Sequence, residues 1–319
     1  EIEKLLSRSG IYDIYEFGQG KLLSIGGVVN ENSPLIGKPL HSIHEKDARG
    51  HWLITAYVRD GKSSIANGNT IVNKDDHIKI IVKSGEVATA TSLLGISGRK
   101  EIDKAIIIGA SRSSELLAER LVSNKYDVIV LDDNESDCTR IAENLSQVIV
   151  ICADPKDPKN IIDAGVNDST ALIALSKDDS KNIVCSLIAK SLGVPEIITR
   201  VNKIDYMDLL KETSIQATIS TRIAAANEIL KDVRSENVTS ALTFEDSEVE
   251  ALEIQLSESC SVLGEELKDI ILPSSSLIAG VIRRGDVHIP TGEWQFAAKD
   301  KLVVFSLPKS ISEIEKIFC

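Results

Sequence analysis

The residues best suited to chemistry form a short loop, Gly109–Ser114, which is followed by an acid at Asp132. The loop follows an apolar run and precedes a segment with helical spacing, and the acid ends the next apolar run. Dinucleotide-binding sites have this order: N–H groups at a helix N-terminus bind phosphate, and the acid accepts hydrogen bonds from ribose hydroxyls. The pattern predicts a nucleotide site at the end of a strand.

The loop departs from the G-x-G-x-x-G pattern of such sites. Gly109 is present, but Ser111 and Ser114 replace the second and third glycines. The second glycine lets the backbone approach the pyrophosphate, and the third lets the helix pack closely on the strand. We therefore predict that NAD(H) binds this loop weakly or not at all, whereas a mononucleotide such as ATP or ADP, or no ligand, is tolerated.

Each of these residues also has a purely structural interpretation. Ser111 and Ser114 are suitable caps for the following helix. Arg112 could pair with phosphate or be a solvated arginine, and Asp132 could bind ribose or begin the next helix. The sequence leaves these alternatives open.

No catalytic set accompanies the loop. The chain contains no G-x-S-x-G, H-E-x-x-H or Walker sequence, and residues 100–220 contain no histidine. Hydride-transfer enzymes commonly use histidine as an acid or base. Lys177, Asp178 and Asp179 fit better as the polar start of a helix. We predict a non-catalytic protein, with an NAD-dependent dehydrogenase as a less favoured alternative.

The elements that must position the loop alternate along the middle of the chain. Short apolar runs predict strands over 104–109, 127–133, 148–154, 170–176, 196–201 and 216–220. Helical spacing predicts helices over 114–123, 135–146, 157–164, 178–192 and 204–212. This βαβ repetition predicts an α/β fold, a Rossmann-like doubly wound parallel sheet with right-handed connections.

The two flanks of this predicted domain resemble each other. The stretch that begins at Leu53 matches the stretch that begins at Leu277, with Arg59 matching Arg283 and Asp76 matching Asp300. Each copy has the pattern of a turn, a short helix, a strand, a glycine hairpin and a last strand. We therefore predict one small α+β module on each side of the α/β domain.

Composition and charge limit the partners. The 36 Lys and Arg against 48 Asp and Glu give a formal net charge of −12, which disfavours nucleic acid as a partner. No apolar run approaches the roughly 18–20 residues that span a bilayer. Five widely spaced cysteines indicate reduced thiols in a cytoplasmic protein. The five histidines suggest no metal site.

Residues 104–220 resemble the nucleotide-binding domain of the TrkA/KTN/RCK family, which regulates potassium channels and transporters. The matching stretches include Ala105–Gly109 and Ala171–Asn182. The two flanking copies resemble the C-terminal module of the same family, through stretches such as Val262–Gly264 and Ile289–Gly292. The resemblance covers nearly the whole chain.

The resemblance implies a domain order. Residues 1–20 are expected to hold the end of a preceding crossover helix and a linker, and residues 21–90 a first TrkA-C module. Residues 100–235 are expected to form a TrkA-N nucleotide-binding domain with its crossover helix, and residues 240–319 a second TrkA-C module. This order resembles a tandem regulatory subunit that lacks its first nucleotide-binding domain.

The resemblance also implies a function. It suggests a cytoplasmic regulatory subunit, peripheral on the inner face of the cell membrane, that controls potassium uptake by a TrkH-like transporter. NAD(H) or ATP/ADP is the expected control ligand. The family's binding positions correspond here to Gly109, Ser111, Arg112, Asp132, Asp154, Ser176 and Arg200. A structural assembly domain with a decayed nucleotide site is the main alternative.

The segment Thr221–Val233 carries one apolar stripe. Its members recur at steps of three and four residues and are Ile223, Ala226, Ile229, Leu230 and Val233. The resemblance implies that this crossover helix packs against its equivalent in another nucleotide domain. We therefore expect a homodimer or a higher, ring-like oligomer, with packing inside the chain as the alternative.

Overall fold

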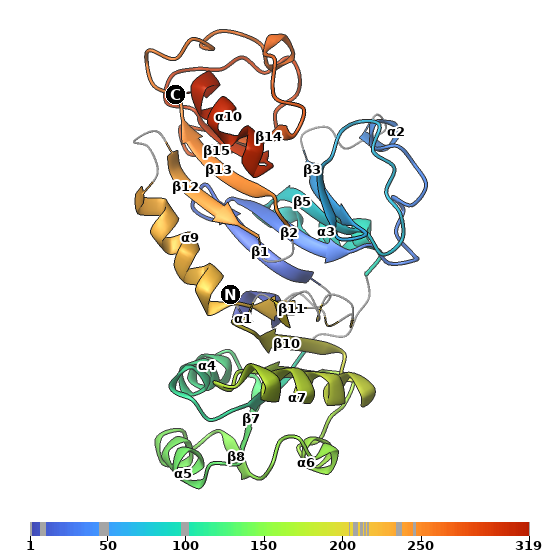
Figure 1. Cartoon of the computed structure of the whole chain (residues 1–319), viewed down its shortest axis with the longest axis vertical. Coiled ribbons are helices and arrows are strands. Elements are labelled where there is room, and N and C mark those ends of the chain that lie inside the picture. Colours follow the sequence, from blue (N-terminus) through green and yellow to red (C-terminus); the bar gives the residue numbers. More distant parts are fainter. Residues whose placement is uncertain are drawn as a thin grey trace. The chain divides into compact units, whose positions relative to one another are not determined.

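The computed structural model (Figure 1) describes residues 2–6, 11–44, 51–96, 102–203, 205–206, 210, 213, 215, 217–233, 238–244 and 247–318. Its backbone contacts separate two compact units. Unit 1 contains Glu1–Tyr12 with Gly98–Arg222, and unit 2 contains Asp13–Ser97 with Ile223–Cys319.

Unit 1 contains a six-stranded sheet in the order β11-β10-β9-β6-β7-β8, with every neighbouring pair parallel. Its strands are β6 (Lys104–Ile108), β7 (Asp127–Asp132), β8 (Ile149–Cys152), β9 (Thr170–Ala174), β10 (Glu196–Arg200) and β11 (Ala217–Ile219). The central strands β6 and β9 are almost entirely buried, as expected for a sheet covered on both faces. The predicted Rossmann-like doubly wound sheet is confirmed.

Unit 1 also contains described helices, several of which pack on this sheet. They are α1 (Ile2–Leu6), α4 (Arg112–Ser123), α5 (Glu135–Asn144), α6 (Pro158–Asp163) and α7 (Asp179–Ser191). Helix α4 contacts β6 and β7, α5 contacts β7 and β8, and α7 contacts β9 and β10. The apolar face of α4 buries Leu117, Ala118 and Leu121. The helix predicted over 204–212 lies largely outside the described residues.

Unit 2 contains two five-stranded sheets with the same topology, β1-β2-β5-β3-β4 and β12-β13-β16-β14-β15. The first consists of β1 (Ile11–Phe17), β2 (Leu22–Val28), β3 (Trp52–Arg59), β4 (Lys62–Ile65) and β5 (His77–Lys83). The second consists of β12 (Val238–Thr243), β13 (Glu250–Gln255), β14 (Ser276–Arg283), β15 (Asp286–His288) and β16 (Lys301–Ser306). The shared strand order is the structural counterpart of the internal repeat.

Short helices complete each copy. The first copy contains α2 (Leu40–His44) and ends in α3 (Val87–Leu94). The second contains a 3₁₀ turn, Leu267–Asp269, and ends in α10 (Ile311–Phe318). Helix α9 (Thr221–Val233) precedes the second copy, where the crossover helix was predicted.

The first sheet begins earlier than the sequence suggested. Residues 1–20 were expected to be a helix end and a linker, but they include β1, which is hydrogen-bonded to β2. Ile11, Ile14 and Phe17 of β1 are buried. The prediction of a linker was wrong. The identities between the two copies begin farther along the chain, so they could not indicate the first strand of either sheet.

A shared apolar cluster joins the two sheets of unit 2. At Gly280, a Cβ atom would lie 2.5 Å from Cδ2 of Leu22, so the absence of a side chain lets Leu22 approach β14. The buried Lys79 pairs with Asp13, and its Nζ lies 4.7 Å from the centre of the Phe244 ring. The two repeat copies therefore share this cluster, while the second copy also has a core of its own.

The repeated arginines and aspartates form the same bidentate ion pair in both copies. Arg59 Nε and Nη2 donate to Asp76 at 2.8 and 2.7 Å, and Nη2 also donates to the Ile71 carbonyl at 2.7 Å. Arg283 donates to Asp300 at 2.7 and 2.6 Å and reaches a main-chain carbonyl in the same way. These contacts fasten the loop before the last strand to the glycine-hairpin strand, which explains why the identities recur.

This pair predicts a stability effect. Asp300 is 1% exposed, so Asp300→Asn should leave Arg283 with a poorly matched buried partner and lower the free energy of unfolding of unit 2 by about 2–3 kcal/mol. Asp286→Asn, on the exposed end of the same hairpin, should change it little. Thermal and urea denaturation followed by circular dichroism would measure both, and equal stability of the two variants would contradict the prediction.

Candidate nucleotide-binding site

The loop after β6 lies at the topological switch point of unit 1. From β6 the chain proceeds to β7 and β8 on one side, and then returns to β9, β10 and β11 on the other. Ligands of open α/β sheets bind outside the carboxyl ends of the strands at such a point. Gly109 directly follows β6, and Ser176 follows β9 on the other side of the crevice.

Gly109 is required by the closeness of these two loops. Its φ of +100° is strained for any residue with a side chain. A Cβ atom there would lie 2.6 Å from the Cα and 2.8 Å from the backbone nitrogen of Ser176. The first glycine of the pattern is therefore fixed by backbone packing across the switch point, whether or not a ligand is bound.

The two serines form a helix cap. Ser111 is the N-cap of α4, and its Oγ accepts the Ser114 backbone N–H at 3.2 Å. The two hydroxyl oxygens are 3.0 Å apart, and Ser114 is fully buried. The observed contacts are therefore those of a helix cap. Ser111 accepts the hydrogen bond of the Ser114 N–H, a group that could otherwise donate to a phosphate.

Asp132 is buried at the end of β7 and faces the loop. Its Oδ2 accepts the Ala110 N–H at 2.8 Å, and its Oδ1 accepts the Asn134 N–H at 2.8 Å. The carboxylate thus holds the glycine loop and starts the turn into α5. Because each carboxylate oxygen can accept more than one hydrogen bond, these contacts leave acceptor capacity for ribose hydroxyls.

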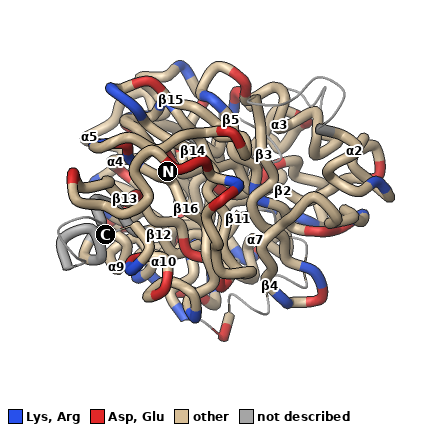
Figure 2. Tube along the Cα trace, turned by 90° about the horizontal axis from the view of Figure 1, so that it is seen from above, with Lys and Arg blue, Asp and Glu red and all other residues tan. Residues whose placement is uncertain are grey.

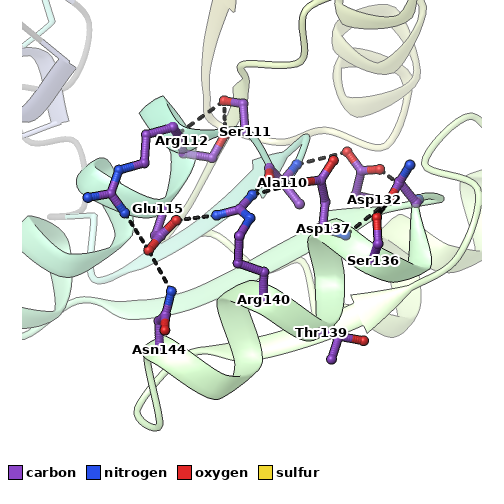
Figure 3. A network of polar contacts seen from close by, with 12 residues as sticks. Ala110, Ser111, Arg112, Glu115, Asp132, Ser136, Asp137, Thr139, Arg140 and Asn144 are labelled. Carbon is purple, nitrogen blue, oxygen red and sulfur yellow. Dashed lines mark hydrogen bonds and ion pairs between the residues drawn. The ribbon is translucent and has the colours of Figure 1, made fainter.

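A buried glutamate organises the other side of the loop (Figure 3). Glu115 accepts hydrogen bonds from Arg112 at 2.6 Å and Asn144 at 3.0 Å, and it pairs closely with Arg140. Arg140 also donates to the Ala110 carbonyl at 2.6 Å and to Asp137 at 2.9 Å. This network connects α4, α5 and the glycine loop.

Glu115, Arg140 and Asn144 were not predicted as site residues from the sequence. One local signal was available, because Arg140 and Asn144 are four residues apart and so lie on the same face of a helix. Nothing in the local sequence indicates that this face meets Glu115. Arg112 was a candidate phosphate ligand, and its guanidinium is held by Glu115 in this structure.

The network predicts a pH-dependent contribution to stability. Burial raises the pKa of Glu115, but hydrogen bonds from Asn144 and Arg112 and the charges of Arg112 and Arg140 outweigh it and lower the pKa overall. A pKa that is lower in the folded state stabilises the fold above the unfolded pKa of about 4.3, and the contribution disappears as the pH falls through the folded value.

Glu115→Gln should therefore lower the free energy of unfolding of unit 1 by about 1–3 kcal/mol at pH 7, with the difference shrinking in acid. Glu119→Gln, on the exposed face of the same helix, is the matched control and should have little effect at either pH. Urea denaturation at neutral and acidic pH would measure this, and a difference that grows in acid would refute it.

The remaining candidate residues lie, like Gly109 and Asp132, at the carboxyl ends of the parallel strands. Ser176 Oγ accepts the Asp178 N–H at 3.2 Å, and Asp154, after β8, is exposed and accepts the Lys156 N–H at 3.0 Å. Arg200 is the last residue of β10, and its buried Nε has no hydrogen-bond partner among the residues that the structure describes. Asp154 follows β8 and Arg200 ends β10, and each of these strands is two positions from β6, about 10 Å to either side.

An ion pair crosses the same edge. Lys181 Nζ lies 2.8 Å from Asp133 Oδ1, which connects the first turn of α7 with the residue after Asp132. The hydrogen bond from Lys181 lowers the pKa of Asp133. This pair was not predicted from the sequence, because its two residues are far apart in the chain.

The described residues contain no group of three or more His, Cys, Asp or Glu side chains that could hold a metal ion. Within the same residues, every helix is too short or too polar to cross a membrane. Lys and Arg are interspersed with Asp and Glu along the trace (Figure 2).

The fold and this site define a Rossmann-like domain accompanied by two copies of a small α+β module. The TrkA-N domain family matches residues 105–221, and the TrkA-C domain family matches residues 28–95 and 251–318. The chain therefore belongs to the TrkA family of TrkA-N and TrkA-C domain proteins, which confirms the resemblance seen in the sequence.

Its relatives include proteins called Trk system potassium uptake protein TrkA. The homolog 1 of Methanosarcina mazei is 27% identical over 321 residues, covering 100% of this chain and 70% of that protein. The Azorhizobium caulinodans protein is 28% identical, covering 98% of this chain and 69% of that protein.

Solved structures support the same fold. The GsuK RCK domain is 16% identical with a TM-score of 0.51, and the match covers 98% of this chain and 66% of that one. A GsuK channel bound to NAD is 18% identical with a TM-score of 0.52, and the match covers 98% of this chain and 56% of that one.

Proposed function

We propose that this chain is a non-catalytic regulatory component of a potassium uptake system, and that unit 1 responds to an adenosine nucleotide. The observation that carries the proposal is the loop at the switch point, fixed by Gly109 and held by Asp132, in a chain of the TrkA family. Regulation follows if the ligand binds one arrangement of the domains better than another and so shifts its population.

The ligand we favour is a mononucleotide, ATP or ADP, over NAD(H). Asp132 has acceptor capacity for the ribose, whereas Ser111 already caps the N–H that a pyrophosphate would approach. The NAD in the GsuK channel belongs to that protein. A dinucleotide holds its pyrophosphate between two nucleosides and would have to displace this helix cap to reach the N-terminus of α4, whereas the phosphate chain of ATP or ADP is free at one end and can lie away from the capped N–H.

The loop serines give a direct test of this preference. Changing Ser111 and Ser114 to Gly frees the helix N-terminus and should strengthen NADH binding by about 1–2 kcal/mol, roughly tenfold. Ser113→Gly, at an exposed position in the same turn, is the matched control and should leave NADH affinity unchanged. Calorimetry would measure both, and micromolar or tighter NADH binding by the unchanged chain would refute the preference.

We further propose a TrkH-like membrane potassium transporter as the partner, with the chain on the cytoplasmic side as a peripheral subunit. Support comes from the Trk system relatives. The test is potassium flux into vesicles that contain the transporter, with the whole regulatory protein and ATP or ADP added in turn. A nucleotide-dependent change in flux is expected, and flux that is indifferent to the protein would refute this role.

The second candidate is a structural assembly domain whose nucleotide site has decayed. The capping of α4 by Ser111 favours it, since that contact completes the loop without a ligand. In this case flux would respond to the protein but not to nucleotides, and calorimetry would detect no binding.

A further inference from the structure

Two cysteines meet at one corner of unit 1. Cys138 lies near the start of α5 and is buried, whereas Cys152 is the last residue of β8 and is exposed. Cys185 and Cys260 are buried as well. Cys152 is therefore the accessible thiol among the cysteines that the structure describes.

The main chain of Asp132 brings the two cysteines together. Its carbonyl oxygen accepts the Cys138 thiol at 3.4 Å and the N–H of Ala153, the residue after Cys152, at 2.9 Å. Asp132 and Cys152 are also direct partners in the register of β7 and β8. Since α5 packs on both strands, the two cysteines flank a single carbonyl group.

The two cysteines differ in how readily an oxidant can reach and react with them. Burial, together with the neighbouring Cys152 thiol, raises the pKa of Cys138 to about 12. Oxidants react with accessible sulfur and with thiolates, so Cys138 is protected from direct attack while Cys152 meets solvent. Cys152 is suited to react first, and Cys138 is placed to resolve the product.

We propose that Cys138 and Cys152 form a reversible disulfide when the chain meets hydrogen peroxide. The Cys152 sulfur attacks one peroxide oxygen and the O–O bond breaks, which gives a Cys152 sulfenic acid and one water that carries the thiol proton. The Cys138 sulfur then attacks the Cys152 sulfur, the S–O bond breaks, and hydroxide leaves with the Cys138 proton as a second water. The two thiols supply the two electrons that reduce the peroxide, and a dithiol reductant reverses the reaction.

The disulfide has a structural consequence beside the candidate site. It removes the S–H donor from the Asp132 carbonyl and links the start of α5 covalently to the end of β8. The carboxylate of the same aspartate holds the glycine loop through Ala110. Oxidation would thus act on the residue that positions the loop, and the disulfide itself does not depend on whether a nucleotide binds there.

Peptide mapping tests the proposal. The whole chain, carrying Cys319→Ser so that the cysteine outside the described residues cannot react, is treated with hydrogen peroxide. Free thiols are then alkylated, and the digest is analysed by mass spectrometry without reduction. We expect one linked peptide pair joining Cys138 and Cys152, short by two hydrogens and lost on treatment with dithiothreitol.

Three variants sharpen the result. Cys138→Ser should stop at a Cys152 sulfenic acid that dimedone traps, Cys152→Ser should give neither product, and Cys185→Ser should leave the link unchanged. Circular dichroism identifies any variant that fails to fold. In that case, the proposal is tested by peptide mapping of the chain that carries only Cys319→Ser. Recovery of Cys152 in that chain as a free thiol, or linked to Cys185, would overturn the proposal.

Discussion

Replacing Asp132 with alanine is expected to weaken the binding of ATP or ADP by about 1–3 kcal/mol, or roughly five- to 150-fold. Two ribose hydroxyls can donate to one carboxylate, and alanine offers them no acceptor. The same change leaves the Ala110 and Asn134 N–H groups without their partner, so unit 1 should also lose stability. It should remain folded, because β7 is paired on both sides by β6 and β8.

Asp127→Ala is the matched control for this experiment. Asp127 is exposed and begins the same strand, so it lies at the amino-terminal end of the strand, away from the candidate site. Calorimetric titration and urea denaturation of both variants separate the two roles of Asp132. Lowered stability with unchanged nucleotide affinity would show that Asp132 serves the loop alone.

Ile229→Asp is expected to convert a dimer of this chain into monomers. Ile229 is 61% exposed on α9, and Ala226 on the same stripe is exposed too. Asn227, in contrast, is buried and bonds the N–H and carbonyl of Thr243 at 2.9 and 3.1 Å. Because successive helix residues turn by about 100°, Ile229 lies on the side of α9 opposite to this contact.

The helix is therefore docked through Asn227 and presents its apolar side outward. We propose that a second copy of the chain covers this side. Burying several hundred Å² at roughly 25 cal/mol per Å² gives several kcal/mol before association costs, and a carboxylate in that surface would abolish the gain. The side chains of Leu230 and Val233, predicted as part of the stripe, lie outside the described residues.

Ala224→Asp is the control for this prediction, since Ala224 is exposed on the same helix about 140° away from Ile229. Sedimentation at high micromolar concentration should find dimers for the unchanged chain and the control, and monomers for Ile229→Asp. An unchanged chain that sediments as a monomer would contradict the proposed interface.

The sheet of unit 1 could be predicted because its strands are short, continuously apolar runs. Ala105–Ile108 and Ala171–Ala174 are buried on both faces, and each run is followed by residues that cap a helix. The parallel sheet then placed Gly109, Asp132 and Ser176 at one edge without any need for tertiary detail. The repeat likewise predicted two similar modules. Its identities include Arg59 and Arg283, which recur because each makes the same ion pair in its own copy.

The rest depended on contacts between distant elements. The local sequence permits both a capping and a phosphate-binding role for Ser111, and the Ser114 N–H distinguishes them only once the loop is folded. Glu115 resembles an ordinary acid in the first turn of a helix until Arg140 and Asn144 arrive from α5. Strand β1 was missed because its residues have no recognisable identity with those of the second copy.

Calorimetric titration with ATP, ADP, NAD and NADH is the decisive test of the proposal that unit 1 binds an adenosine nucleotide at the Gly109–Ser114 loop. We expect saturable binding of ATP or ADP that weakens in Asp132→Ala and persists in Asp127→Ala, with NAD and NADH binding more weakly than either. Absence of saturable heat for all four nucleotides, from a chain shown to be folded, would contradict it.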